Sequence, residues 1–418
     1  MRIGTTRKKP ESNLFVGLDI GTTKVVALVG EVGLGGNIDV IGIGSHPSRG
    51  LKRGIVINID ATVQSIKRAI EEAELMAGCE IHSVYTGIAG SHIRSLNSHG
   101  IVAIRDREVT QADIDRVIDA AKAVAIPADQ KILHILPQEF IIDSQEGVRE
   151  PIGMSGVRLE AKIHIVTGSV SAAQNIVKCI ERCDLRVSDV ILQQLASSAA
   201  VLTDDEKELG VCLVDIGGGT TDIAVFTEGA IRHSAVIPIA GDQVTNDIAV
   251  ALRTPTKHAE EIKIKHACAL LDSLVDGNVN IEVPGTTNQR QAREISRKVL
   301  VDVVGARYEE LFNLVLAELR RSGFKDLIVA GIVLTGGASQ VVGAADLAER
   351  IFQLPVRIGT PQNIGGMPEV IGNPIYATGT GLLLTGYHHF QQGRAEAVNF
   401  SQQRSLWVRM KNWFQENF

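Results

Sequence analysis

The stretch that decides the fold is LFVGLDIGTTKVVALV at 14–29, together with its near-copy VCLVDIGGGTTDIAVF at 211–226. In each stretch an apolar run ends in an aspartate, a turn of glycine and threonine follows, and a second apolar run begins. Valine and isoleucine runs that flank a glycine turn predict a β-hairpin in both places. Asp, Gly and Thr are ordinary turn residues, so one copy alone could be a coincidence. Two copies that share Asp-Ile-Gly indicate a duplicated design instead.

The residues that follow each hairpin extend the repeat. A third strand is expected at about 38–43 and at about 231–239, and a helix is expected over 61–77, where apolar side chains recur on one face. The simplest explanation is an α/β fold of two lobes that share one hairpin-plus-helix design and face each other. A Rossmann dehydrogenase is the competing interpretation, but no G-x-G-x-x-G opens a helix after a strand. A P-loop is absent too, because the chain has no Gly-Lys dipeptide.

Length and charge narrow the classes of protein that fit. The chain has 418 residues, is 44% hydrophobic and has a net charge of -6, which argues against nucleic acid as the main partner. Its five cysteines are too scattered for a disulfide framework and fit a cytosolic protein. The N-terminus is basic and polar and is followed by no apolar run that could serve as a signal peptide, so export is not expected. No run of ~20 continuous apolar residues exists, so no transmembrane helix is predicted.

The two glycine turns predict a site for a phosphate chain, because glycine backbone and threonine hydroxyls can approach and hydrogen-bond phosphate oxygens. Asp19 and Asp215 stand just before the turns, where carboxylates would repel phosphate unless a cation lay between them. Mg²⁺ bridges carboxylates to phosphates and keeps several waters, so we expect both aspartates to hold it, directly or through water. The candidate phosphate-binding residues are Asp19, Gly21, Thr22, Thr23 and Lys24 in the first turn and Asp215, Gly217, Gly218, Gly219, Thr220, Thr221 and Asp222 in the second.

A third glycine element follows the apolar run at 332–334. Its sequence, Thr335-Gly336-Gly337-Ala338-Ser339, precedes a stretch that is compatible with a helix. A glycine pair between strand and helix lets a flat base or sugar lie against the backbone. A tight turn without a ligand is the alternative, and the position after both phosphate-type turns favours the ligand.

The order of these three elements resembles the ATPases of the actin, Hsp70 and sugar-kinase superfamily. Within that superfamily the chain is similar to the FtsA family of bacterial cell-division proteins, from about residue 13 to the C-terminus. The stretches that support this likeness are Ser48-Arg49-Gly50, Pro137-Gln138-Glu139, Ser155-Gly156-Val157-Arg158, Leu195-Ala196-Ser197-Ser198 and Arg357-Ile358-Gly359.

The resemblance implies an actin-like, duplicated two-lobed fold with an FtsA-type inserted subdomain and a C-terminal amphipathic helix. It implies adenosine contacts from Glu260 and Lys263, in an E-x-x-K arrangement, and from Gly336 and Gly337. A solvated helix face is the alternative for Glu260 and Lys263. The implied domains are 13–83 with 165–194 (first lobe core), 84–164 (inserted subdomain), 195–240 with 326–390 (second lobe core), 241–325 (second-lobe insertion), 391–404 (flexible linker) and 405–418 (membrane-targeting helix).

One departure from actin bears on catalysis. Counted back from the second phosphate motif, the place where actin has a glutamine to orient the attacking water falls near Ser197 or Ser198, with Gln193 and Gln194 a turn upstream. A serine hydroxyl is shorter, and placement of the nucleophile carries much of phosphoryl-transfer catalysis. We therefore expect no dedicated catalytic residue, at most weak ATP hydrolysis, and mainly the role of a nucleotide-regulated structural adaptor.

The C-terminal residues SLWVRMKNWFQENF at 405–418 predict an amphipathic helix. Docking on the body, a protein groove and a membrane interface are the three interpretations. A buried large apolar side chain contributes ~1.5–3 kcal/mol and a basic residue near anionic lipid only ~1 kcal/mol, so the aromatic face must dominate. Tryptophan placement and the resemblance favour the membrane. The expected anchor residues, which share one face, are Leu406, Trp407, Met410, Trp413, Phe414 and Phe418.

The resemblance implies a protein that binds ATP and Mg²⁺, self-associates, and tethers filaments of the tubulin-like division protein FtsZ to the cytoplasmic face of the inner membrane at the septum. The expected partners are FtsZ, further copies of the chain, membrane lipid and later division proteins, with no nucleic acid. A cell-shape-type actin homologue and a sugar or metabolite kinase are the rivals, and the kinase needs an acidic general base that the sequence does not reveal. An Hsp70-like chaperone would need a substrate-binding domain, for which too few residues follow.

Overall fold

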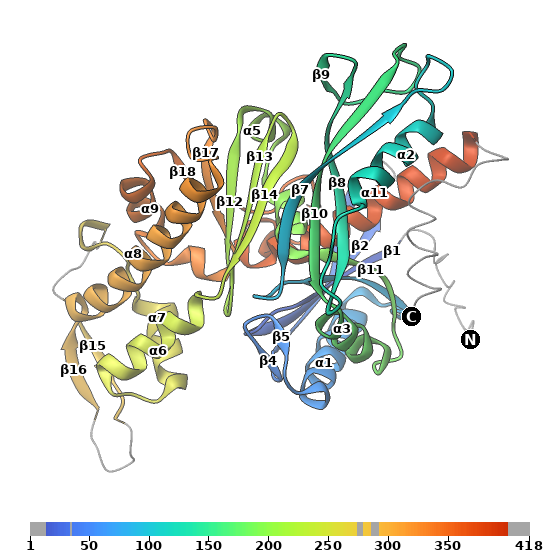
Figure 1. Cartoon of the computed structure of the whole chain (residues 1–418). Coiled ribbons are helices and arrows are strands. Elements are labelled where there is room, and N and C mark those ends of the chain that lie inside the picture. Colours follow the sequence, from blue (N-terminus) through green and yellow to red (C-terminus); the bar gives the residue numbers. More distant parts are fainter. Residues whose placement is uncertain (1–13, 34–35, 274–278, 286–291, 400–418) are drawn as a thin grey trace, which may run out of the picture.

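The computed structural model describes residues 14–33, 36–273, 279–285 and 292–399. Two lobes, each built on its own sheet, lie side by side, and a third sheet extends from the first lobe along the second (Figure 1). The expected membrane-targeting helix at 405–418 lies outside the described residues. None of the described helices combines the length and the apolar character that crossing a membrane requires.

The first lobe contains the first predicted hairpin and its third strand. The strand order is β11-β6-β1-β2-β3-β19, with β1, β2 and β3 antiparallel and β6 parallel to β1. Helix α1 packs against β3, and a Cβ on Gly44 would lie 1.8 Å from the Ala69 carbonyl oxygen, so glycine permits this close approach. The elements are β1 (Leu14–Ile20), β2 (Lys24–Val32), β3 (Ile38–Pro47), α1 (Ile59–Ala77), β6 (Ser83–Ile88), α3 (Val170–Glu181), β11 (Arg186–Leu192) and β19 (Gly365–Gly366).

The second lobe repeats the same topology. Its order β18-β17-β12-β13-β14 matches β11-β6-β1-β2-β3 strand for strand, including the parallel pair beside the hairpin. The predicted duplication is therefore confirmed. The elements are α5 (Asp204–Leu209), β12 (Val211–Ile216), β13 (Thr221–Thr227), β14 (Ala230–Ile237), α6 (Gly241–Leu252), α7 (Thr256–His266), β15 (Asn280–Val283), β16 (Arg293–Ser296), α8 (Arg297–Ser322), β17 (Gly331–Thr335), α9 (Ala344–Phe352) and β18 (Val356–Ile358).

The inserted subdomain has a four-stranded sheet, β7-β10-β8-β9, with α2 packed against it and an apolar core of its own. Strand β6 pairs with β1 and β11, so residues 84–88 belong to the sheet of the first lobe. The expected boundary at 84 had assigned them to the inserted subdomain instead. The elements are β7 (Arg94–Ala103), α2 (Gln111–Lys122), β8 (Gln130–Ile142), β9 (Gln145–Val148) and β10 (Arg158–Ser169).

The chain returns to the first lobe in α11 (Ala377–Asn399), after α10 (Pro368–Ile371). Helix α11 packs on β1 and on α4 (Gln193–Val201), and a Cβ on Gly381 would lie 1.7 Å from the Ala196 carbonyl oxygen. The end of the expected second-lobe core therefore contacts the first lobe. The expected linker at 391–404 is helical as far as Asn399, which differs from the prediction.

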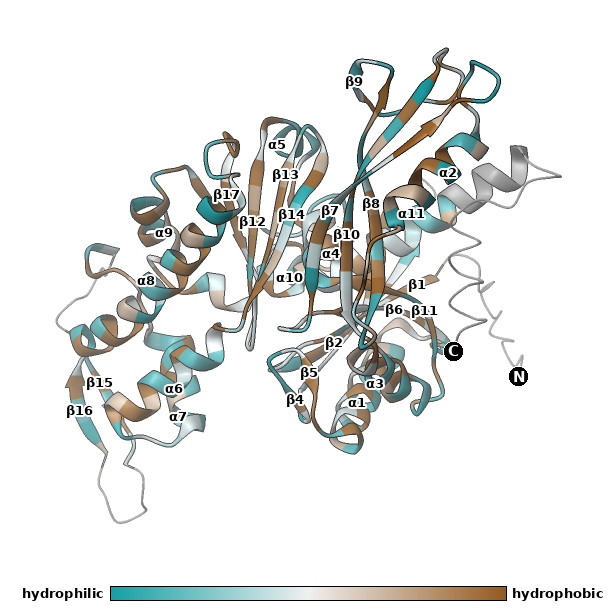
Figure 2. Cartoon of the chain, viewed as in Figure 1, coloured by the Kyte–Doolittle hydropathy of each residue, from teal (hydrophilic) through white to brown (hydrophobic). Residues whose placement is uncertain are grey.

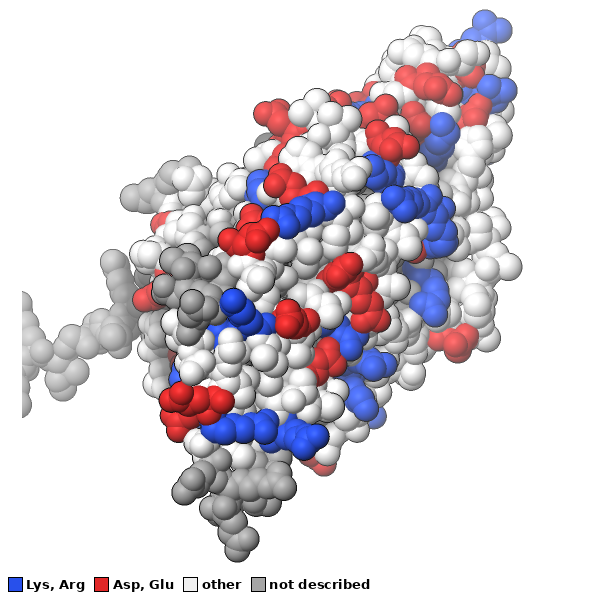
Figure 3. Space-filling model, turned by 90° about the vertical axis from the view of Figure 1, so that its left-hand side faces the viewer, with Lys and Arg blue, Asp and Glu red and all other residues white. Residues whose placement is uncertain are grey.

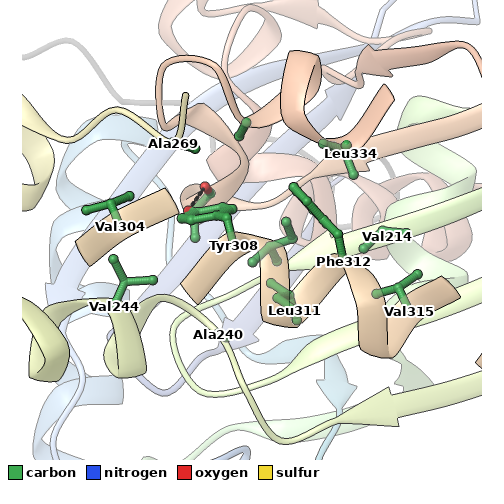
Figure 4. Packing of buried hydrophobic residues seen from close by; sticks show 14 of the residues in the cluster. Val214, Ala240, Val244, Ala269, Val304, Tyr308, Leu311, Phe312, Val315 and Leu334 are labelled. Carbon is green, nitrogen blue, oxygen red and sulfur yellow. Dashed lines mark hydrogen bonds between the residues drawn. The ribbon is translucent and has the colours of Figure 1, made fainter. Parts of the chain in front are cut away.

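The core of the second lobe lies between its sheet and α8. Tyr308 and Phe312 are buried there (Figure 4), and so is Phe352. The ring centroids are 5.8 Å apart for Tyr308 and Phe312 and 5.6 Å apart for Phe312 and Phe352. The Tyr308 hydroxyl donates to the Ala338 carbonyl oxygen at 2.5 Å, which satisfies the polar end of this buried ring. Apolar residues colour the strands of both lobes, as expected for sheets covered by helices (Figure 2).

Charge is mixed on the outer face of the second lobe. Figure 3 shows basic and acidic side chains interspersed there, without a large patch of one sign. Ion pairs of α8 keep opposite charges adjacent, as between Arg307 and Asp247 at 2.5 Å and between Arg321 and Glu318 at 2.5 Å. Such a surface is typical of a solvated helix face.

The α8 core supplies a stability prediction. Phe312→Ala leaves a cavity between two rings and should lower the free energy of unfolding by about 3–5 kcal/mol. Leu314 is 40% exposed on the same helix, so Leu314→Ala should change it by less than about 1 kcal/mol. Urea denaturation followed by circular dichroism measures both variants. Equal losses would contradict the assignment of Phe312 to the core.

Candidate functional site

The two glycine turns face each other and touch. A Cβ on Gly218 would lie 1.8 Å from Thr23 Oγ1, and a Cβ on Gly219 would lie 2.5 Å from Thr22 Oγ1. Only glycine fits at these two positions, because any side chain would push the lobes apart. The turn of the first lobe and the turn of the second therefore lie directly against each other.

Asp215 ends β12 and is almost fully buried at this contact. Its Oδ2 accepts hydrogen bonds from Ser197 Oγ at 2.5 Å and from Thr378 Oγ1 at 3.3 Å. Burial raises the pKa of the carboxyl, and the two hydroxyl donors lower it again in part. Neither donor was foreseen in this role, because α4 and α11 reach Asp215 only through tertiary packing.

Asp19 occupies the matching place in the first lobe. Its Oδ1 accepts a hydrogen bond from Gln193 Nε2 at 3.1 Å, and Lys24 lies near enough to act on its charge. Burial raises the pKa of Asp19 to about 7, Lys24 opposes this, and the Asp215 carboxylate adds to it. The pKa of Lys24 is in turn lowered to about 8 by burial, and its ammonium lies 4.7 Å from the ring centroid of Tyr376.

Gln193, a turn upstream of the serines at which the water-orienting position was expected, therefore lies beside the first phosphate turn. Ser197, one turn later on α4, is engaged by Asp215, and Ser198 Oγ donates to the Leu195 carbonyl oxygen at 2.8 Å. An amide, longer than a serine hydroxyl, is thus the side chain of α4 that reaches Asp19. Counting residues back from Asp215 gave Ser197 or Ser198, one turn past Gln193, because the start of α4 depends on how β11 ends.

Asp222 adds a third carboxyl to the site. It lies opposite Asp215 on β13, its Oδ2 accepts from Thr220 Oγ1 at 3.0 Å, and its buried Oδ1 has no hydrogen-bond partner among the described residues. Burial raises the pKa of Asp222 to about 8, and the charges of Asp215 and Asp19 raise it further. Three buried carboxyls that disfavour one another's ionised forms make this region favourable for a cation.

The start of α6 is hydrogen-bonded to the backbone of the second glycine turn. The Gly241 and Asp242 amides donate to the carbonyl oxygens of Gly217 and Gly218, at 3.1 and 2.8 Å. Thr23 Oγ1 donates to Asp242 Oδ1 at 3.4 Å, which adds a contact between the lobes. Burial raises the pKa of Asp242, while Lys263 opposes that rise.

Glu260 and Lys263 lie on α7, against the start of α6 and the end of the second glycine turn. They form an ion pair at 2.7 Å, and Lys263 Nζ donates to the Gly241 carbonyl oxygen at 3.1 Å and to Thr245 Oγ1 at 2.8 Å. Glu260 also accepts a hydrogen bond from Thr245 Oγ1. The pair is therefore joined to the end of the second glycine turn, and the solvated-face alternative does not describe Lys263.

The third glycine element lies next to Asp215 and the start of α6. Gly336 has φ +84°, and a Cβ there would lie 2.3 Å from Asp215 Oδ1, so only glycine fits. Gly337 begins a short 3-10 helix and is bordered by Ile375. A Cβ on Gly241 would lie 3.4 Å from Ala338 Cβ, which brings the element next to the start of α6.

The remaining candidate residues hold the turns in shape. The Gly21 amide donates to the Lys24 carbonyl oxygen at 3.0 Å, and the Gly217 amide does the same to Thr220 at 3.0 Å. Thr221 Oγ1 donates to the Ile239 carbonyl oxygen at 2.7 Å, just beyond the end of β14, so this hydroxyl is already bonded within the second lobe. All the candidate residues of the three elements and α7 are thus contiguous, while the six anchor residues at 406–418 lie outside the described residues.

The donor set fits a magnesium nucleotide better than a protein-only metal centre. Among the described residues, no group of three or more His, Cys, Asp or Glu side chains could hold a metal ion. Mg²⁺ commonly takes one or two carboxylates and fills its other positions with water and phosphate oxygens. Asp19 and Asp215 stand beside the two glycine turns, close enough for the Asp215 charge to raise the pKa of Asp19, and they match that pattern.

Comparison with known proteins agrees with this arrangement. The family model described as "Cell division protein FtsA" matches residues 212–381, and the one described as "SHS2 domain inserted in FTSA" matches residues 90–167. A relative from Pseudomonas aeruginosa, "Cell division protein FtsA", is 64% identical over 411 residues, which cover 97% of this chain and 98% of that protein. The SHS2 match agrees with the sheet of β7 to β10.

Two solved structures share the architecture. "PilM-PilN type IV pilus biogenesis complex" superposes with a TM-score of 0.65 at 15% identity, over 89% of this chain and 98% of that one. "MreB 5 of Spiroplasma citri bound to AMPPNP" gives a TM-score of 0.57 at 15% identity, over 93% and 99%. The fold of this chain is thus the actin-like, duplicated two-lobed α/β fold with an inserted SHS2 subdomain.

The raised pKa of Asp222 generates a pH prediction. Its usual value is 3.8 and its folded value about 8, so between these values the folded state binds more protons than the unfolded state. Stability without ligand should therefore fall as pH rises from 5 to 8. Asp222→Asn removes this titration and should flatten the pH profile of stability. The stability of the variant relative to the parent should therefore be higher at pH 8 than at pH 5. Thermal denaturation without nucleotide or magnesium measures it; parallel profiles would contradict the burial of a titrating Asp222.

Proposed function

Because the chain belongs to the FtsA family of cell-division proteins, we propose that it binds ATP with Mg²⁺ between its lobes and links FtsZ filaments to the membrane. The observation that carries the nucleotide part is the contact of Gly218 and Gly219 with Thr22 and Thr23. It brings two glycine turns and their preceding aspartates to one place. A phosphate chain held there would contact both lobes at once.

In this proposal the chain's own groups divide the work of binding. Amides of the two glycine turns, with Thr22, Thr23 and Lys24, would bind phosphate oxygens. Asp19 and Asp215 would hold Mg²⁺, which neutralises charge between carboxylates and phosphates. Ser197 and Thr378 orient Asp215 by donating to its Oδ2, so they would position the carboxyl rather than contact the nucleotide. The solved MreB 5 structure bound to AMPPNP, an actin-like relative in fold, supports this choice of ligand.

Adenosine would lie beside the phosphates in the second lobe. Gly336 and Gly337 offer a backbone surface without side chains, next to Asp215. Glu260 and Lys263 adjoin it through their contacts with Gly241 and Thr245. Polar groups on one side and glycine backbone on the other suit a ribose and a base.

ATP turnover would be weak and secondary to binding. Gln193 is held by Asp19 and Ser197 by Asp215, so neither is free to orient a water without giving up a bond. A nucleophile that is poorly positioned reacts slowly in phosphoryl transfer. Nucleotide binding would instead stabilise the closed relation of the lobes, in which the chain self-associates.

The membrane part of the proposal rests on the C-terminal sequence. The aromatic face of 405–418 would lie in the lipid interface, so that the chain is a peripheral protein of the inner membrane at the septum. The body would bind FtsZ, further copies of itself and later division proteins. Family membership supports these partners.

Nucleotide binding is tested with three variants. Asp215→Ala removes a proposed magnesium ligand, and Gly218→Asp places a charged side chain where Thr23 already lies. Each should weaken Mg-ATP binding by about ten- to hundredfold, because charge-assisted contacts of the phosphates are lost. Gly147→Asp is the control: its φ of +73° is one that aspartate tolerates better than most residues, and a Cβ there has open space around it, far from the turns in sequence. Calorimetry measures affinity; undiminished binding in both site variants would refute the site.

Membrane attachment is tested with the tail. The double variant Trp407→Asp, Trp413→Asp should abolish flotation with anionic liposomes, because two interfacial anchors become charged. Asn412→Asp, on the polar face of the expected helix, adds a similar charge and should leave flotation intact. FtsZ filaments should co-sediment with liposomes in the presence of the parent only. Flotation of the double variant would show that the tail is not the anchor.

A further inference from the structure

We propose that Arg53 binds the terminal phosphate of the nucleotide and thereby sets a preference for ATP over ADP. This inference rests on the proposed nucleotide function. Arg53 lies in the turn between β4 (Leu51–Lys52) and β5 (Ile55–Val56), a two-stranded hairpin of the first lobe. No sequence pattern connects this hairpin with the phosphate turns, since it follows the first glycine turn by about thirty residues and has no glycine-threonine pattern of its own.

The hairpin touches both glycine turns. The Gly54 amide donates to Thr22 Oγ1 of the first turn at 3.0 Å. A Cβ on Gly219 of the second turn would lie 2.9 Å from the Arg53 Cα. Arg53 therefore stands where the two proposed phosphate-binding turns meet, and it comes from the first lobe while Gly219 comes from the second.

The backbone of this turn makes arginine an unusual choice. Arg53 and Gly54 have φ values of +49° and +75°, and two residues connect the paired strands. Such turns favour Asn-Gly, because both central residues adopt the left-handed region, which glycine and asparagine tolerate better than other residues do. An ordinary exposed turn would gain stability from asparagine, so arginine here points to a role for the guanidinium.

The partners of the other cations near the turns indicate what the Arg53 guanidinium does. Lys24 lies beside Asp19 and over Tyr376, and Lys263 is paired with Glu260. Arg53 is exposed, and its side chain forms no ion pair or hydrogen bond with the other described residues. A guanidinium offers five donors in a planar fork that suits phosphate. Arg53 is thus a cation at the meeting of the turns that is still available for a phosphate group.

The test compares ATP with ADP. Arg53→Asn keeps the left-handed turn and removes the charge, so it should weaken Mg-ATP binding by about tenfold or more and Mg-ADP binding by less than about threefold. Arg53→Lys should fall between parent and Arg53→Asn for ATP. Lys52→Asn removes the same charge from the neighbouring exposed residue and should leave both affinities unchanged.

Calorimetry with Mg-ATP and Mg-ADP gives the two affinities, and thermal denaturation without nucleotide shows that the variants fold. An equal loss for both nucleotides, or no loss, in Arg53→Asn would overturn the inference while the nucleotide function stands. An ATP-specific loss in Lys52→Asn alone would also overturn it. A parent that binds neither nucleotide would refute the proposed function first, and this inference with it.

Discussion

The structure depends on the close contact between two glycine turns. Gly218 and Gly219 leave no room for a Cβ, so Thr22 and Thr23 of the other lobe approach their backbone directly. This approach removes water from the aspartates that precede the turns, and burial is the largest cause of their raised pKa values. Buried carboxylates that share a site cost free energy in their ionised form. Closure of the lobes and neutralisation of that charge are therefore linked, whichever cation or proton supplies it.

The orientation of Asp215 shows how the lobes depend on each other. Its strand, β12, belongs to the second lobe, but its donors Ser197 and Thr378 come from α4 and α11. Both helices pack together, and α11 also lies on β1, where a Cβ on Gly17 would come within 2.5 Å of the Gly379 carbonyl oxygen. A shift of the first lobe would thus move the hydroxyls that hold a second-lobe carboxyl. This arrangement couples lobe position to the geometry of the site without a separate signal.

The sequence predicted the parts of this site that are local. Duplicated apolar-Asp-Gly-Thr patterns give hairpins wherever they occur, so Asp19 and Asp215 could be placed at strand ends, and the strand that follows each could be expected. The contact of Gln193 with Asp19 and the place of Arg53 were not predicted, because they depend on how α4 begins and on a small hairpin that folds between two turns. The return of α11 to the first lobe was missed for the same reason. Apolar periodicity indicates a buried face but does not say which lobe buries it.

The inserted subdomain is attached to the two lobes by different kinds of contact. Toward the first lobe its apolar side chains Ile93, Leu133 and Val166 join the core of that lobe. Toward the second lobe, Leu136 adds one apolar contact, and edge strand β14 receives side-chain hydrogen bonds at its backbone. The donors are Ser95 to Ser234 at 2.8 Å, Asn97 to Arg232 at 3.1 Å and Gln138 to Ile231 at 2.8 Å. Water can replace such bonds at a net cost of about 1 kcal/mol each, whereas separating apolar surface costs about 25 cal/mol for every Å² exposed. The subdomain is therefore held as part of the first lobe, and the polar contact with β14 is the one that lobe movement can break at lower cost.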